Sequence, residues 1–452
     1  MLSTLHDTAV ALQEGRLSAV ALTEDALARA TDPAGEGARV FTKVYAERAR
    51  AAAQASDTLR AAGLSRSPID GLPISIKDLF DVAGETTLAG SVALEGAPVA
   101  DDHAVVVQRL LAAGAVIVGR TNMVEFAYSG LGVNPHYGTP LNPWDRASGR
   151  IPGGSSSGAG VSVTDRMALG AIGSDTGGSV RIPAALCGIA GFKPSAWRVS
   201  MAGVLPLSAN LDSIGPLAPS VRCCATLDAI LAGDDITRAS PVWQAAPLRG
   251  LRLAVPTTLA LDGMDEHVAA TFAAAISELS AAGAQVDEID VPEFAQLAAI
   301  NKTGGFTAAE AWAWHRDLIA RAGDRYDPRV VSRIRRGAEM SAADYLDLLD
   351  AREAWVAAVD HRIAGYDALI LPTVPVTAPT VAEVSADDAV YYATNGLILR
   401  NPTLINFLDG CAVSVPCHTA GTAPVGLMIA GANGTDSRIL SIGMAVEDLL
   451  QA

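Results

Sequence analysis

Short apolar runs alternate with stretches of helical periodicity along most of this chain. The apolar run LPISIKDLF at 72–80 precedes a helical pattern at 105–114 and the apolar run AVIVG, which ends at Gly119. The same alternation recurs later, with apolar runs at 250–256, 285–292 and 367–376. Strands that alternate with helices and are apolar throughout are typical of α/β proteins, whose sheets are buried on both faces. We therefore expect an α/β fold with a mostly parallel β-sheet.

Helical patterns flank this alternation. Apolar residues recur every three to four positions over 3–29, and 48–62 is an Ala-rich run, which predicts two surface helices. Region 301–362 combines Trp and Arg with helical periodicity and predicts a helical cap over the sheet. A length of 452 residues favours two or three domains. The proline spacing at 373–380 indicates an ordered loop rather than a linker, so the residues alone leave the domain count open.

Charge and composition exclude several classes of protein. The chain has 33 Lys and Arg against 49 Asp and Glu, a net charge of −16, which repels nucleic acid and anionic membranes. No secretory leader is visible, and Gln108 and Arg109 interrupt the most apolar stretch, at 104–119. The five cysteines form no CxxC pair and indicate reduced thiols. We expect a cytoplasmic protein that binds neither nucleic acid nor membrane.

Several common catalytic motifs are missing. The seven histidines form neither an HExxH motif nor a His/Cys cluster with the spacing of a zinc site. There is no GxSxG motif, and GGSSSG at 153–158 lacks the following Lys-Ser or Lys-Thr of a phosphate-binding loop. If the protein is a hydrolase, we expect it to work without a metal or other cofactor and with a base other than histidine.

Two glycine-serine turns are the candidates for a catalytic site. The turn GGSSSG occupies 153–158, and DTGGS occupies 175–179 at the end of an apolar run. Glycines allow a ligand to approach the backbone closely, and successive N–H groups can bind a developing oxyanion. Ser179 would then be a nucleophile beside these amides. A solvated loop is the alternative for GGSSSG, whereas the apolar residues after Ser179 indicate that the second turn contacts the core.

Lys77 is the candidate base. It lies inside the apolar run at 72–80. Burial favours the neutral amine and can lower the pKa of a lysine by several units from about 10.4, which would make it a general base near neutral pH. In the alternative interpretation, Lys77 pairs with Asp78 or extends to the surface.

The chain resembles the amidase signature family of serine hydrolases. The resemblance is carried by ISIKDLF, GRTNMVEFAYSG, NPWD, GGSSSG, GSDTGGSVRIPAALCGIAGFKPS and LDSIGPLAPSV, which cover about 70–222. Ser155 and Ser179 are 24 residues apart, the spacing of the two catalytic serines of this family. The resemblance implies one amidase domain over 1–452, built on a single large mixed, mostly parallel sheet with helices on both faces.

The resemblance also implies roles for individual residues. Ser179 is similar to the nucleophile that forms the acyl-enzyme, Ser155 to the bridging serine after a cis peptide bond, and Lys77 to the base. The remaining implied positions are the oxyanion-hole amides of Thr176, Gly177, Gly178 and Ser179, and the supporting residues Gly154, Ser156, Asp175 and Arg181.

The sequence departs from the family pattern at Arg120, Val124, Ala196 and Trp197, none of which belongs to the implied triad. The stretch at 395–403 lacks the acidic residue that the glutamine-dependent amidotransferases of the family keep in this region. Its apolar residues, with Tyr128 and the Trp-rich 311–314, predict a pocket for an apolar or aromatic group, although plain core packing is the alternative.

We therefore expect an amidase that hydrolyses small-molecule carboxamides or anilides, with carbamates and ureas as further candidates. The alternatives are a non-catalytic binding protein and a glutamine-hydrolysing amidotransferase. A homodimer is an open alternative to a monomer.

Overall fold

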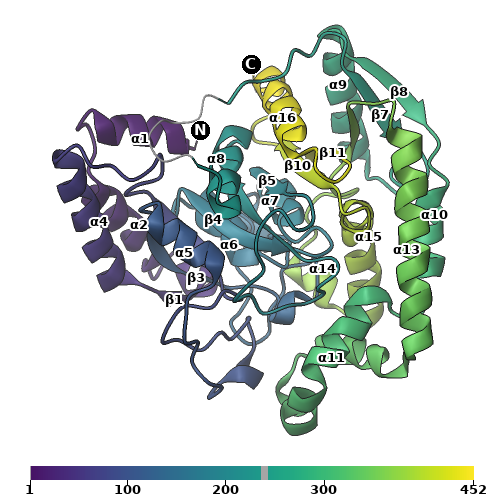
Figure 1. The fold of residues 1–452 in the computed structure, drawn as a ribbon, viewed down its shortest axis with the longest axis horizontal. Coiled ribbons are helices and arrows are strands. Elements are labelled where there is room, and N and C mark those ends of the chain that lie inside the picture. The colour runs from purple at the N-terminus through teal and green to yellow at the C-terminus, as the bar shows by residue number, and fades with distance from the viewer. Residues whose placement is uncertain (1, 236–242, 452) are drawn as a thin grey trace.

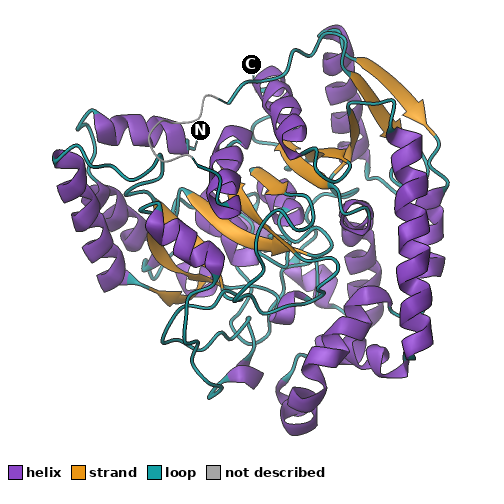
Figure 2. Ribbon diagram, in the orientation of Figure 1, coloured by secondary structure: helices purple, strands orange, loops and turns teal. Residues whose placement is uncertain are grey.

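The computed structural model describes residues 2–235 and 243–451 and contains one sheet of eleven strands, in the order β1-β3-β2-β4-β6-β5-β10-β11-β9-β7-β8 (Figures 1 and 2). The strands are β1 Phe41–Val44, β2 Pro73–Lys77, β3 Val116–Thr121, β4 Gly170–Asp175, β5 Ala190–Lys193, β6 Ser213–Ala218, β7 Arg252–Pro256, β8 Gln285–Ile289, β9 Ala368–Pro372, β10 Cys411–Pro416 and β11 Gly426–Gly431. The α-helices are α1 Leu5–Gln13, α2 Ala19–Ala30, α3 Gly37–Val40, α4 Ala46–Ala61, α5 Val105–Ala112, α6 Ser157–Thr164, α7 Arg181–Cys187, α8 Val221–Ala232, α9 Glu266–Ala281, α10 Glu293–Ile300, α11 Gly305–Ala322, α12 Pro328–Arg335, α13 Ala342–Ile363, α14 Val381–Ser385, α15 Asp388–Phe407 and α16 Asp436–Leu450.

Parallel pairing occurs in two parts of the sheet. β2 pairs in parallel with β3 and β4, and β7 pairs in parallel with β8 and β9. Six of the ten ladders between the described strands are antiparallel, and they include all ladders of the middle strands β6, β5, β10 and β11. The single large mixed sheet is confirmed. Its parallel share is smaller than the alternation of strands and helices predicts, because loops without a crossover helix join β5 to β6 and β10 to β11.

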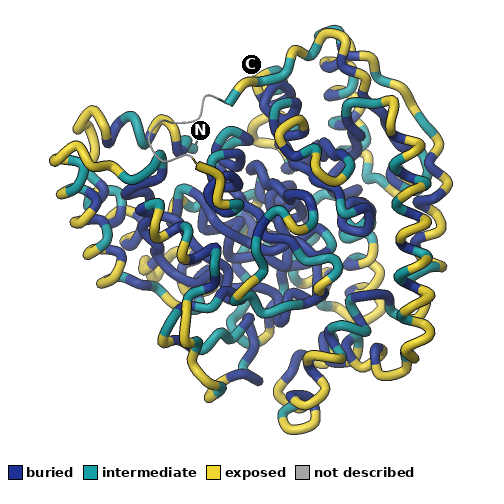
Figure 3. Tube along the Cα trace, in the orientation of Figure 1, coloured by how far each residue is buried: buried dark blue, intermediate teal, exposed yellow. Residues whose placement is uncertain are grey.

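Helices cover both faces of the sheet. Along β3, Val116 and Val118 pack against α2 and α6 on one face, whereas Ile117 belongs to the core on the other face. That second core also contains residues of α5, α8 and α16. Alternate residues of the strand thus enter different cores, which is why the strand is apolar throughout. Burial is concentrated along the central strands, and the exposed positions lie mainly on the outer helices (Figure 3).

The amino-terminal helices differ in number from the prediction. The pattern over 3–29 forms two helices, α1 and α2, rather than one. The chain turns between them because Gly15 adopts a φ of +69°, and Ser18 then caps α2 by accepting a hydrogen bond from the N–H of Ala21. The helix predicted at 48–62 is present as α4.

Region 301–362 contains α11, α12 and α13, and α13 lies at the opposite end of the molecule from α1, α2 and α4 (Figure 1). Leu348 and Trp355 of α13 share a core with Phe407 of α15 and Leu369 of β9, which joins these helices to the sheet. The assignment of 1–452 to one domain remains a prediction.

No helix in the described ranges is both long and apolar enough to cross a membrane. All five cysteines are free thiols, and only Cys417 is not fully buried.

Candidate active site

Two neighbouring strands bring a lysine and a serine to one edge of the sheet. β2 ends at Lys77, and its parallel neighbour β4 ends at Ser174 and Asp175. Parallel neighbours end at the same edge, so these side chains lie together. Within β2, Ile76 packs into one core, whereas the hydroxyl of Ser75 contacts Ser162 of α6 on the other face. Lys77 follows Ser75 by two residues and shares its face.

The Lys77 amine is bonded to two serines. Lys77 is fully buried, and its Nζ lies 2.7 Å from Ser155 Oγ and 2.9 Å from Ser174 Oγ. Asp78 instead accepts a hydrogen bond from Nε of Arg120 at 2.6 Å. The alternative in which Lys77 pairs with Asp78 or extends to the surface is therefore wrong. Sequence reasoning missed Ser174, although its place directly before Asp175 at a strand end was a usable signal.

Burial has a direct consequence for the charge of Lys77. Desolvation lowers the pKa of Lys77 from 10.5 to about 7, and the negative charges of Asp175 and Asp212 limit this decrease. The amine is therefore largely neutral above pH 7, with a lone pair that can accept a proton.

Ser155 lies in a crowded turn that requires glycine. The Gly154–Ser155 peptide bond is cis, as the resemblance implies. A Cβ atom at Gly154 would lie 2.6 Å from the backbone nitrogen of Gly132, so only glycine fits there. The backbone N–H of Ser156 donates to the carbonyl oxygen of Ser179 at 3.3 Å. This bond ties the Ser155 turn to the Ser179 turn.

The Asp175 carboxylate shapes the loop that carries Ser179. It accepts hydrogen bonds from the N–H groups of Gly178 at 2.8 Å and Val180 at 3.1 Å. Gly178 has a φ of +117°, and a Cβ atom there would lie 2.5 Å from Pro402. Together these contacts explain why the turn needs both an aspartate at its start and a glycine before the serine.

The same geometry revises the expected oxyanion-hole amides. The Gly178 N–H points to Asp175, so it is not free to bind a ligand. Within the described ranges, the N–H groups of Thr176, Gly177 and Ser179 donate to no other protein atom. The sequence could not reveal this difference, because it depends on the direction of each amide in the turn.

Arg181 holds Asp175 from the other side. The two side chains are fully buried, with Nη2 and Oδ1 2.9 Å apart, and Asn406 donates to both carboxylate Oδ1 and backbone oxygen of Asp175. Burial alone would raise the pKa of Asp175, but the charge and hydrogen bonds of Arg181 outweigh it and hold the pKa well below its usual range.

Breaking this pair should destabilise the protein. Asp175→Asn leaves the Arg181 charge buried and unpaired, and such changes cost about 3–5 kcal/mol. We expect a decrease of this size in the free energy of unfolding, measured by urea titration. Asp25→Asn, which removes an exposed pair with Arg29, is the matched control and should change stability little. Equal stability of the two variants would contradict the role of Asp175.

A cavity of about 480 Å³ opens beside this loop. Its wall includes Ser179, Thr176 and Gly177, but neither Lys77 nor Ser155. Of the three residues implied as a triad, only Ser179 lines the cavity. The residues that complete the wall are Ala127, Tyr128, Ser129, Leu207, Leu211, Leu259, Leu297, Ala298, Asn301, Gly304, Phe306, Thr307, Ala308, Arg333, Arg336, Gly396, Leu399, Arg400, Thr403, Leu404 and Phe407.

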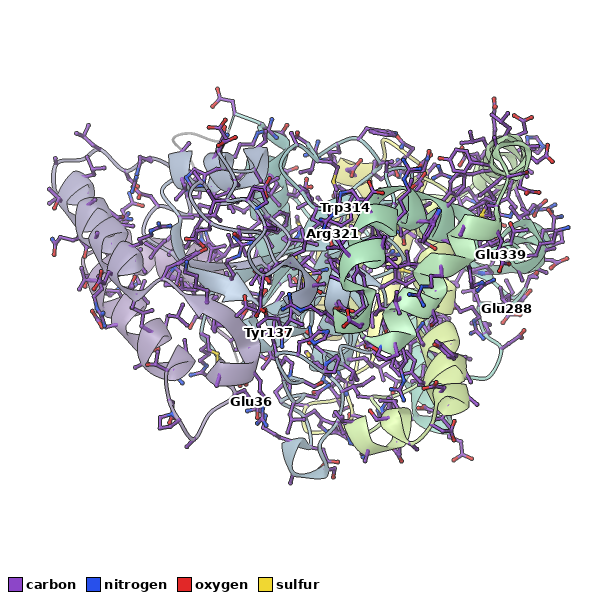
Figure 4. All side chains as sticks on the ribbon, turned by 90° about the horizontal axis from the view of Figure 1, so that it is seen from below. Glu36, Tyr137, Glu288, Trp314, Arg321 and Glu339 are labelled. Carbon is purple, nitrogen blue, oxygen red and sulfur yellow. The ribbon has the colours of Figure 1, made fainter. Side chains whose placement is uncertain are left out.

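The expected pocket is correct in part. Tyr128 lines the cavity, and so do four residues of 395–403. The Trp-rich 311–314 does not line it, because α11 presents its first turn, at Phe306, to the cavity and carries the tryptophans further along. Trp314 lies on the same helix as Arg321 and is 39% exposed (Figure 4).

In the part of the chain that the structure describes, no group of three or more His, Cys, Asp or Glu side chains is arranged to hold a metal ion.

Comparison with known proteins assigns the fold and these motifs to a family. The family model described as Amidase matches residues 21–440. The chain belongs to the amidase family. This amidase-family chain is 37% identical to a 2-amino-5-chloromuconic acid deaminase from Comamonas testosteroni, over 89% of this chain and 87% of the relative. It is 35% identical to a glutamyl-tRNA(Gln) amidotransferase chain from Chloroflexus aggregans, over 98% of this chain and 96% of the relative.

A solved amidase structure is also similar to this amidase-family chain. The TM-score is 0.87 at 31% identity, over 99% of this chain and 100% of the other. The expected family and the expected enzyme class, a hydrolase of C–N amide bonds, are thereby confirmed.

Proposed function

We propose that this protein hydrolyses the C–N bond of small-molecule carboxamides or anilides through an acyl-enzyme on Ser179. The observation that carries the proposal is the buried Lys77 amine, which lies 2.7 Å from Ser155 Oγ and has a pKa of about 7. A neutral amine in contact with a hydroxyl is the arrangement that general-base activation of a serine requires. Ser179 is the one member of the triad in contact with the cavity, so it is the group that a substrate can reach.

Each step of the proposed reaction uses one of these groups. Lys77 accepts the proton of Ser155, Ser155 accepts the proton of Ser179, and Ser179 Oγ attacks the carbonyl carbon. The N–H groups of Thr176, Gly177 and Ser179 stabilise the negative oxygen of the tetrahedral intermediate. When the C–N bond breaks, the proton passes back through Ser155 to the leaving nitrogen. Water then attacks the acyl-enzyme with the same base and releases the acid.

The amidotransferase alternative is less consistent with the cavity. A glutamine substrate presents an ammonium group beside its carboxylate. Among the described residues that line the cavity there is no Asp or Glu to pair with that ammonium group. By its name, the Comamonas testosteroni relative is a deaminase of a small acid, so C–N bond chemistry on small molecules is represented among the relatives.

A substrate panel tests the proposal. The protein is assayed with aryl amides, aliphatic amides, carbamates, ureas and glutamine, and release of amine or ammonia is measured. We expect turnover of an amide or anilide that exceeds glutamine turnover. Hydrolysis of glutamine alone would favour the amidotransferase, and absence of turnover together with absence of serine labelling would favour a binding protein.

The pH dependence of kcat/KM should follow the protonation of Lys77. Because Lys77 must be neutral to act as a base, kcat/KM should rise about tenfold per pH unit up to an apparent pKa of about 7 and be level above it. A profile that is level down to pH 5.5 would contradict the role of Lys77. Asp212 is the control, because burial raises its pKa to about 6 and it therefore titrates close to the pH at which the rise is expected. In Asp212→Asn the rise should persist at slightly lower pH, since the Asp212 charge raises the Lys77 pKa.

A further inference from the structure

Thr176 has one hydrogen-bond donor that is committed and one that is free. Its side-chain Oγ1 donates to Oδ1 of Asp212 at 2.5 Å. Within residues 2–235 and 243–451, its backbone N–H donates to no other protein atom. Thr176 is also part of the cavity wall, together with Ser179. The N–H, and not the hydroxyl, is therefore the donor that Thr176 can offer to a substrate.

The peptide unit that carries this N–H is held at its carbonyl oxygen. That oxygen belongs to Asp175, and it accepts hydrogen bonds from Oγ of Ser213 at 3.1 Å and from Nδ2 of Asn406 at 3.0 Å. Because a trans peptide unit is planar, its N–H and C=O groups point in opposite directions. The direction of the Thr176 N–H is thus fixed before a ligand binds.

Asp212 holds Thr176 at its side chain. The carboxylate of Asp212 is anchored through Oδ2, which accepts from the N–H groups of Leu207 at 2.9 Å and Ser208 at 3.0 Å, so that Oδ1 remains for Thr176. Ser208 is anchored in turn, because its Oγ donates to Glu310 of α11 at 2.5 Å. Threonine is β-branched and has restricted rotation about χ1, so a fixed hydroxyl also restrains the backbone that carries it.

We propose that Asp212 is a positioning residue of the oxyanion hole, which holds Thr176 by its hydroxyl so that the Thr176 N–H meets the oxygen that becomes negative when Ser179 attacks. The proposal rests on the proposed function and adds a residue that is not part of the cavity wall. Asp212 directly precedes Ser213, so two adjacent residues fix the hydroxyl of Thr176 and the carbonyl group of its peptide unit. A donor fixed in advance needs no rearrangement during the reaction, and loss of one such donor costs about 10²- to 10³-fold in kcat.

The first experiment removes the hydroxyl and keeps the N–H. Thr176→Val preserves the shape of the side chain but offers no donor to Asp212, so kcat for the best amide of the panel should fall by about 10- to 100-fold while KM stays within about threefold. Thr176→Ser restores the donor and should recover kcat to within about threefold of the unaltered protein. Thr87→Val is the matched control, because Thr87 Oγ1 donates to Asp81 Oδ1 at 2.6 Å outside the cavity wall. It should leave kcat and KM within about twofold.

The second experiment tests whether Asp212 acts through Thr176. Asp212→Ala should lower kcat by about 10- to 100-fold in the unaltered protein, but by less than about threefold in protein that already carries Thr176→Val, because the contact is then already lost. Asp212→Asn keeps an acceptor for the N–H groups of Leu207 and Ser208 and a polar partner for Thr176, so it should lose less kcat than Asp212→Ala. If thermal unfolding shows that Asp212→Ala does not fold, the comparison of Thr176→Val with Thr176→Ser decides.

Binding of a transition-state mimic separates positioning from a purely structural role. The mimic is a trifluoromethyl ketone with the shape of the best amide. Ser179 Oγ adds to its carbonyl carbon, the serine proton passes through Ser155 to Lys77, and the carbonyl oxygen becomes an oxyanion. The inhibition constant should rise in Thr176→Val by about the same factor by which kcat/KM falls. A residue that only stabilised the fold would lower the unfolding temperature without this match.

The outcomes separate this proposal from the proposed function. Unchanged kcat in Thr176→Val, additive losses in the double variant, or an unchanged inhibition constant would each overturn the positioning role while the proposed function stands. If the unaltered protein turns over no amide, the rate at which a fluorophosphonate labels Ser179 replaces kcat. A slower rate in Thr176→Val than in Thr87→Val then supports the proposal, and equal rates overturn it. Absence of both turnover and labelling in the unaltered protein would overturn the proposed function and, with it, this proposal.

Discussion

Ser179→Ala should lower amide hydrolysis by about 10⁴-fold or more, because it removes the atom that forms the acyl-enzyme. The protein should still fold, since the change deletes one hydroxyl that lines the cavity and the Asp175 bonds that shape the turn remain. The measurement is kcat/KM for the best amide of the panel, with thermal unfolding as a check of the fold. KM should change little compared with kcat, because the cavity wall is preserved.

A second serine provides the control for this result. Ser162 is also buried, lies on the helix that follows Ser155, and bonds to Ser75 outside the triad. Ser162→Ala should therefore retain activity within about tenfold, as expected for a change that affects packing alone. Activity of Ser179→Ala within tenfold of the unaltered protein would mean that another group performs the attack.

Lys77→Met should have the second-largest effect, a loss of about 10³-fold or more in kcat. Removal of a general base costs about 10²- to 10⁴-fold by itself, and here the base also positions Ser155. Methionine is similar to lysine in length and has no ionisable group. The substitution therefore fills the buried site without leaving a charge there. The remaining activity should lose the rise with pH near 7.

The pH dependence of the free energy of unfolding provides an independent test of the Lys77 pKa. The folded pKa of Lys77, about 7, lies below its value of 10.5 in the unfolded chain. Between pH 7 and 10.5 the unfolded state therefore binds more protons at this residue, so its contribution to the free energy of unfolding rises with pH across this window. Lys77→Met should remove that contribution. An unchanged pH dependence of stability would contradict a buried neutral amine.

Lys193 is the matched control for Lys77. It is also buried, and burial lowers its pKa to about 8. Its Nζ donates to the carbonyl oxygens of Pro194 and Gly410 rather than to a serine of the site. Lys193→Met should affect stability but keep the rise of kcat/KM near pH 7. Loss of that rise in both variants would mean that it does not report Lys77.

The chemistry-bearing positions were the most predictable part of this molecule. Lys77 stands out because a cation inside an apolar strand is costly, and the serine turns stand out because their glycines are grouped. The contact of Lys77 with Ser155 could be expected once the chain was recognised as similar to a family. The hydrogen bond from the Gly178 N–H to Asp175 could not be expected, because the direction of that N–H depends on where the Asp175 carboxylate lies.

The middle of the sheet and the cavity were less predictable. β5 has four residues, and alternation alone does not reveal that it pairs antiparallel with β6 and β10. The cavity combines Tyr128 with Arg333 and Arg336, which are more than 200 residues further along the chain. No local pattern links such positions, and the tryptophans of 311–314 carried a stronger sequence signal although they lie outside the wall.

The most direct test of the central claim is to locate a covalent adduct. The protein is treated with a fluorophosphonate between pH 6 and 9, digested, and analysed by tandem mass spectrometry. We predict one modified residue, Ser179, with a labelling rate that rises through pH 7 in parallel with kcat/KM and a large decrease of that rate in Lys77→Met. An adduct on Ser155 or on a serine outside the cavity, or an active protein with no adduct at all, would contradict it.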